Sequence, residues 1–157
     1  MSEETAFRNW IDKIAESVPG FRGYYRKEDR READQLLREK ISSRLKKVKD
    51  VLNEKGRLAT KSGDLGPLDE IARIDKHLEK LDDSIRYANY GYSGFFDRKE
   101  ISTDTLSSVY EIDETLMKWA ENFTDNINVE SHIAEISEEI KTGFNLLEKR
   151  SKIIEGD

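Results

Sequence analysis

The stretch RYANYGYSGFFD, from Arg86 to Asp97, places five aromatic rings and two glycines within twelve residues. Aromatic rings stack on planar groups, and an arginine guanidinium can pair with an anion or lie over a ring. A second stretch, PGFRGYYRKEDRRE from Pro19 to Glu32, again combines glycines, rings and arginines. By residue type, these two stretches are the parts of the sequence best suited to binding.

Three interpretations fit the two stretches. In the first, which we prefer for most of the rings, they fill the open end of a helical bundle and the glycines allow tight turns. In the second, part of the cluster stays exposed and docks a protein, because aromatic residues and Arg are enriched at interfaces. In the third, rings and guanidiniums form a pocket for a planar or anionic small molecule. The candidate binding residues are Phe21, Arg22, Tyr24, Tyr25, Arg26, Arg30, Arg86, Tyr90, Tyr92, Phe95, Phe96 and Arg98.

Catalytic and metal-binding patterns are not evident in the sequence. The chain has no cysteine, and neither His77 nor His132 belongs to a Glu-x-x-His or His-Glu-x-x-His pattern. The glycine-containing stretches match neither the P-loop nor the dinucleotide fingerprint. We therefore expect a protein that is not an enzyme and holds no metal or cofactor.

Asp113 is the carboxylate that stands out, because it is in register with Tyr110 and Met117 on an apolar helix face. The simplest expectation is that it lies at the edge of this face and contacts water. If it is buried, it needs a donor such as an arginine or a tyrosine hydroxyl, since an unpaired buried charge is costly.

Charge is unevenly distributed along the chain, which has a net charge of −6. Residues 26–61 contain 13 basic and 7 acidic residues, whereas residues 100–157 contain 5 basic and 14 acidic residues. We expect the two regions to attract one another or to present solvated faces. The acidic balance argues against nucleic acid as a default partner, although a basic face over residues 27–54 could meet RNA or anionic lipid.

The N-terminal segment is acidic and amphipathic, unlike a signal peptide, and no window is apolar enough to span a membrane. We therefore expect a cytoplasmic protein. At 157 residues, the chain has the length of a single domain.

Apolar residues recur at helical spacing in five segments, and no segment alternates as a strand would. The predicted helices cover residues 2–18, 27–54, 67–90, 102–123 and 128–154, and we expect Gly56 to end the second. Short connections between long helices favour antiparallel neighbours. The predicted fold is all-α: an elongated antiparallel bundle of four long helices plus a shorter N-terminal helix, in one domain over residues 1–157.

This topology places the start of the second helix beside the end of the third, so the two stretches rich in rings should meet in space. We expect a non-enzymatic protein-interaction or scaffold module that docks through this end or through an apolar helix face. The coiled-coil-like, near-heptad rhythm of residues 67–90 also favours self-association. The alternative is a regulatory domain that binds a small anionic or planar ligand among the aromatic loops.

Overall fold

The computed structural model describes residues 5, 8–9, 12, 30–87 and 103–155. Within these ranges it contains no strand, which confirms the all-α class, and its four long helices are those predicted. They are α2 (Arg30–Ser62), α3 (Leu68–Arg86), α5 (Thr103–Asn126) and α6 (Ile133–Glu155). The predicted N-terminal helix over residues 2–18 lies almost entirely outside the described residues and stays a prediction.

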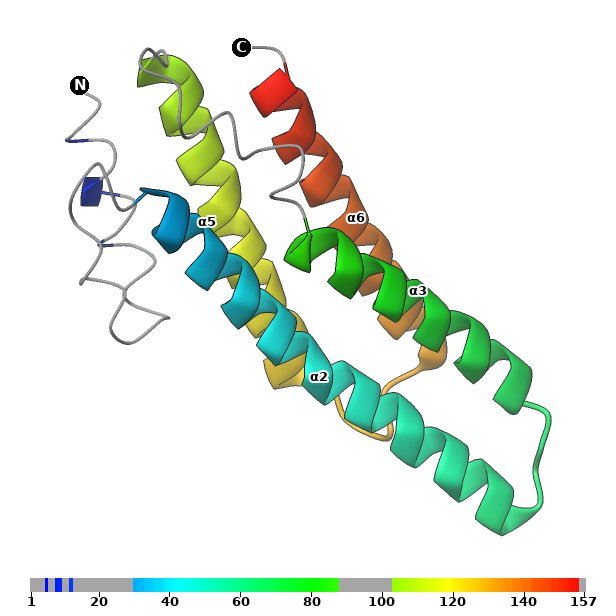
Figure 1. Cartoon of the computed structure of the whole chain (residues 1–157). Coiled ribbons are helices and arrows are strands. Elements are labelled where there is room, and N and C mark those ends of the chain that lie inside the picture. Colours follow the sequence, from blue (N-terminus) through cyan, green and yellow to red (C-terminus); the bar gives the residue numbers. More distant parts are fainter. Residues whose placement is uncertain (1–4, 6–7, 10–11, 13–29, 88–102, 156–157) are drawn as a thin grey trace.

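The helices form two hairpins, α2–α3 and α5–α6, that lie against one another (Figure 1). Within each hairpin the helices are antiparallel, as predicted. Between the hairpins, α2 packs on α5 and α3 packs on α6, and each of these pairs runs in the same direction. The start of α2, the end of α3, the start of α5 and the end of α6 therefore lie toward one end of the bundle.

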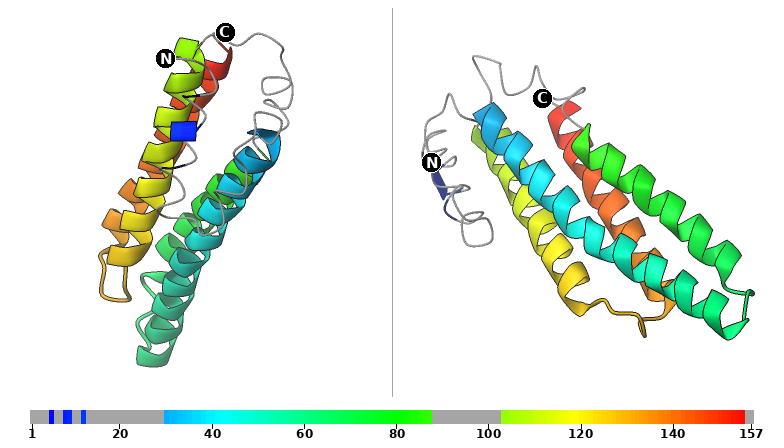
Figure 2. Two further views of the ribbon diagram at one scale, coloured as in Figure 1. Left: turned by 90° about the vertical axis from the view of Figure 1, so that its left-hand side faces the viewer. Right: turned by 60° about the horizontal axis from the view of Figure 1, so that its bottom comes forward.

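The hairpins are also displaced along their length (Figure 2). The α2–α3 turn projects beyond the α5–α6 turn at one end, and the start of α5 and the end of α6 project at the other. The length of α2 contributes to this offset, because its 33 residues extend about 50 Å at 1.5 Å per residue.

One hydrophobic cluster draws on all four helices, and the predicted apolar stripes supply most of it. The buried face of α5 is wide because this helix contacts both α2 and α6. Its buried apolar residues are Val109, Tyr110, Leu116, Met117, Trp119, Ala120 and Phe123.

The predicted end of the second helix at Gly56 is wrong, since α2 continues to Ser62. Around Gly56 the helix gains local support: the Arg57 side chain pairs with Glu54, one turn earlier, and the Thr60 hydroxyl donates to the Gly56 carbonyl at 2.9 Å. The turn occurs instead at Gly63, whose φ of 79° lies in the left-handed region that glycine adopts without a steric penalty.

The predicted start of the last helix at Asn128 is also too early, because α6 begins at Ile133. Residues before it form a turn in which the Asn128 side chain accepts the backbone N–H of Glu130 at 2.8 Å and the Ser131 hydroxyl accepts that of Asn128 at 3.0 Å. Side-chain acceptors thus compete with helix formation at this point.

Gly143 allows α6 to approach α5 closely. A Cβ placed on Gly143 would lie 2.6 Å from Cη2 of Trp119 and 2.9 Å from Cδ2 of Leu81. The indole of Trp119 crosses toward α6 and donates from Nε1 to the carbonyl of Glu139 at 3.1 Å. The indole therefore occupies the space that any larger residue at position 143 would need.

We predict opposite effects for two Gly→Ala substitutions within helices. Gly143→Ala should lower the free energy of unfolding by about 1–3 kcal/mol, because its methyl group overlaps Trp119. Gly56→Ala should raise it by roughly 0.5–1 kcal/mol, because its Cβ meets only Leu68 at 3.9 Å and alanine favours helix. Urea unfolding followed by circular dichroism measures both, and a stabilising Gly143→Ala would contradict the close approach.

Candidate functional site

The start of α2 and the end of α3 meet as predicted. The guanidinium of Arg38 donates from Nη1 to the carbonyl of Arg86 at 2.6 Å and lies 3.5 Å from that of Ile85. These are the last carbonyls of α3. Arg38 thus holds the end of the helix that leads into the stretch after Arg86.

Most of the predicted binding residues lie outside the described part of the chain, so their meeting in space stays a prediction. They are Phe21, Arg22, Tyr24, Tyr25, Arg26, Tyr90, Tyr92, Phe95, Phe96 and Arg98. Arg30 is the first residue of α2, but its side chain is not described.

Arg86 and Tyr87 are the described part of this ring-rich end. The guanidinium carbon of Arg86 lies 5.6 Å from the centroid of the Tyr87 ring, within the range of a cation–π interaction. Tyr87 is 53% exposed and the Arg86 side chain is about half exposed. Tyr87 is therefore an exposed ring of this end, and burial of most of the other rings stays a prediction because they lie outside the described residues.

Beneath this end, four charged side chains form a buried charge cluster: Asp34, Arg38, Asp113 and Arg150, each no more than 7% exposed. Arg150 donates from Nε to Oδ1 of Asp113 at 2.6 Å and from Nη2 to Oδ1 of Asp34. Arg38 donates from Nε to Oδ2 of Asp34 at 3.0 Å. Two carboxylates therefore face two guanidiniums, and the cluster links α2, α5 and α6 directly and α3 through Arg38.

The sequence anticipated this cluster only in part. Asp113 is 1% exposed, so the simplest expectation of contact with water is wrong, while the arginine partner expected for a buried Asp113 is present. Asp34 and Arg38 lie at the i,i+4 spacing that is common for ion pairs on the solvated face of a helix, yet this pair is buried. Arg150 was missed, although its position four residues after Leu146 and four before Ile154 places it on the apolar stripe of α6.

Burial raises the pKa of Asp113 to about 6. Arg150 opposes this rise, and the negative charge of Asp34 adds to it. Oδ2 of Asp113 makes no hydrogen bond within the part of the chain that the structure describes, so one side of the carboxylate lacks the donors that would favour its charged form. The arrangement pairs charges within the core of the bundle.

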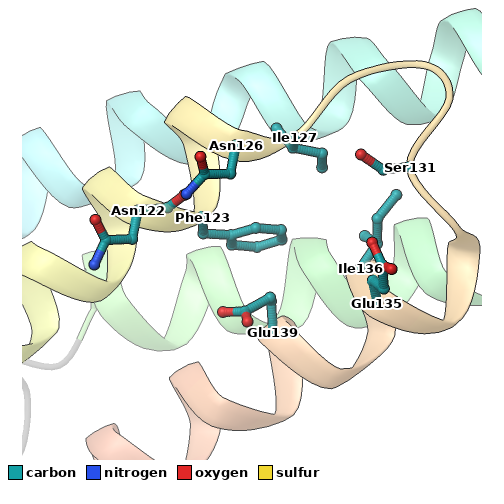
Figure 3. A pocket seen from close by; sticks show the side chains of 8 residues that line it. All are labelled: Asn122, Phe123, Asn126, Ile127, Ser131, Glu135, Ile136 and Glu139. Atoms are coloured by element: carbon teal, nitrogen blue, oxygen red, sulfur yellow. The ribbon is translucent and has the colours of Figure 1, made fainter.

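Two hollows lie at the opposite end of the bundle, on either side of the α5–α6 turn. The α5–α6 groove has a volume of about 260 Å³ and is lined by Asn122, Phe123, Asn126, Ile127, Ser131, Glu135, Ile136 and Glu139 (Figure 3). The hairpin recess has a volume of about 340 Å³ and is lined by Lys55, Leu58, Ala59, Pro67, Glu70, Ile71, Val129, Glu130, Ser131, His132 and Ile133.

Both histidines are exposed. Among the residues that the structure describes, no group of three or more side chains of the types that bind metals is suitably placed for an ion. No helix in the same part of the chain is long and apolar enough to cross a membrane.

The chain was compared with protein-family models, with curated proteins and with solved structures, and none of the three comparisons found a match.

We predict that Arg150→Met lowers the free energy of unfolding by about 3–5 kcal/mol, because it leaves two buried carboxylates without their shared partner. Lys152→Met is the matched control, since this exposed side chain pairs with Glu148 at the surface. The control should change stability by less than about 1 kcal/mol. Equal urea midpoints for the two variants would contradict a structural role for the cluster.

We also predict a pH dependence specific to Asp113. Its pKa is raised in the folded state, so its contribution to stability is fully present below about pH 4 and is lost as the pH rises through about 6. Between about pH 5 and about pH 7.5, the free energy of unfolding of the wild type relative to Asp113→Asn should fall by roughly 1 kcal/mol. A difference between the two proteins that does not vary with pH, or that rises with it, would contradict this assignment.

Proposed function

We propose that the protein is a non-enzymatic interaction module that docks a protein partner through the ring- and arginine-rich end of its bundle. The observation that carries the proposal is the exposed Arg86–Tyr87 pair at the end of α3. Tyr and Arg are the residue types most enriched among those that dominate binding energy at protein interfaces.

The contacts that hold the end of α3 in place beneath this pair favour docking. Arg38 holds the carbonyls of Ile85 and Arg86, and Arg38 is itself held by Asp34 in the charge cluster. A surface residue on an immobilised helix end loses less conformational entropy when a partner binds. Arg86 therefore adds a positive charge and Tyr87 an amphipathic ring at a pre-organised position, which suits a partner that offers carboxylates beside apolar side chains.

The alternative of a small-ligand pocket among the aromatic loops stays a prediction, because most of the residues that would line it lie outside the described part of the chain. Self-association and a cytoplasmic location likewise stay predictions. The docking proposal has the more direct support, because Tyr87 and Arg86 are described and exposed.

A photo-crosslinking side chain at position 87 tests the proposal while keeping an aromatic ring there. We expect p-benzoylphenylalanine in place of Tyr87 to crosslink one defined protein in a native extract, whereas the same group at His77, exposed on the same helix, should not. Adding Arg86→Glu should abolish the crosslink by reversing the charge beside the ring. The helical signal and melting temperature should stay unchanged, because both side chains are exposed.

Two results would contradict docking at this end. One is equal crosslinking from positions 77 and 87, which would indicate random collisions. The other is no crosslink from position 87 in a variant whose melting temperature equals that of the wild type.

A further inference from the structure

The α5–α6 groove has an apolar floor and a polar rim. Phe123, Ile127 and Ile136 form the floor, and all three are buried. In Figure 3 the ring of Phe123 lies between the two helices, with the asparagines on the α5 side and Glu139 on the α6 side. The groove therefore has a small exposed apolar base, supplied by the edges of Phe123 and Ile127, below a line of oxygen acceptors.

The rim is arranged at helical spacing on both sides. Asn122 and Asn126 lie one turn apart on α5, and Glu135 and Glu139 lie one turn apart on α6. The carboxylates of Glu135 and Glu139 make no hydrogen bond or ion pair with another residue that the structure describes.

Two other glutamates of the same helix differ in this respect. Glu138 pairs with Lys141 at 3.2 Å, and Glu148 pairs with Lys152 at 3.2 Å. The groove thus brings together two α6 carboxylates that have no described basic partner, beside α5, which has six acidic residues and one basic residue.

We infer that the α5–α6 groove binds an arginine side chain from a basic segment of a partner protein. A guanidinium presents a planar set of donors that matches carboxylates, and the amide oxygens of Asn122 and Asn126 provide further acceptors. The aliphatic stem of arginine can cover the small parts of Phe123 and Ile127 that stay exposed at the base of the groove, while its charged group meets the carboxylates of the rim. At about 260 Å³ the groove is smaller than typical sites for drug-sized ligands, so its volume suits one inserted side chain.

The hairpin recess adds a second requirement on the partner. It adjoins the groove, since Ser131 lines both, and its apolar lining includes Leu58, which is 39% exposed. Lys55 holds the wall of the recess in place by donating from Nζ to the carbonyl of Val129 at 2.7 Å. The segment that fits both hollows carries an apolar side chain close to its arginine.

This binding surface goes beyond the proposed function, because it lies at the end of the bundle opposite Arg86 and Tyr87. The two proposals can fail independently, because the crosslink from position 87 reports binding at one end and a peptide titration reports binding at the other.

A tryptophan in the core provides the signal for the test. The ring centroid of Trp119 lies 5.8 Å from that of Phe123, and its Nε1 donates to the carbonyl of Glu139. In a Trp10→Phe background, Trp119 is the sole tryptophan of the chain.

The probe is a short alanine-rich peptide with two arginines at i,i+4 spacing and one leucine. The control peptide has citrulline, the neutral isostere, at both arginine positions.

We expect the arginine peptide to change Trp119 fluorescence saturably at low salt and the citrulline peptide not to do so. Glu135→Gln with Glu139→Gln should weaken binding roughly tenfold or more, because the charge-assisted contacts are lost. Glu138→Gln with Glu148→Gln changes the net charge by the same amount and should alter binding by less than about twofold. Both double variants keep isosteric side chains on an exposed or half-buried surface, so urea unfolding should find them folded.

Three results would overturn the inference: equal loss in both double variants, equal binding of the citrulline peptide, or no fluorescence change with any peptide. Sedimentation of the protein without peptide tests the remaining possibility, which is that a second copy of this chain fills the groove. If the wild type self-associates and only Glu135→Gln with Glu139→Gln abolishes this, a second copy fills the groove and the partner-protein assignment is wrong.

Discussion

The pairing of Arg150 with Asp34 and Asp113 is the interaction on which the arrangement of this bundle depends. It brings a cation from α6 between carboxylates from α2 and α5, and Arg38 extends the contact to the end of α3. Hydrophobic packing alone would tolerate several helix registers, because apolar side chains are largely interchangeable. A shift of one helix by a turn would leave a buried charge unpaired, so we infer that the cluster favours a single register.

This register gives the molecule two different ends. At one end, the charge cluster supports the helix end that carries the exposed Arg86 and Tyr87. At the other, the offset between the hairpins places the α2–α3 turn beyond the α5–α6 turn, and the two hollows lie on either side of the latter. If both proposals hold, the exposed Arg86–Tyr87 pair and the acidic groove would engage partners of opposite charge at the two ends of the bundle.

Prediction from the sequence succeeded where contacts between residues close together in the chain determine the structure. The apolar spacing of α2, α3, α5 and α6 predicted four helices and most of their buried faces, because helical periodicity directly determines which side chains share a face. Such predictions failed at Gly56, where helix-supporting contacts from Glu54, Arg57 and Thr60 outweigh the low helix propensity of one glycine. They also failed at Asn128, whose side chain accepts the backbone N–H of Glu130 in a turn.

By itself, the sequence determined that the chain is helical, where its apolar stripes lie, and that the start of α2 meets the end of α3. The first two follow from the spacing of residues close together in the chain, and the third follows from the short connection between the two helices. Only the tertiary structure decided that Asp34, Arg38 and Arg150 are buried with Asp113, and that Glu135 and Glu139 face Asn122 and Asn126 across a groove. The reason is physical: the environment of a charged side chain depends on which helices lie beside it, and that depends on contacts between residues up to 116 positions apart.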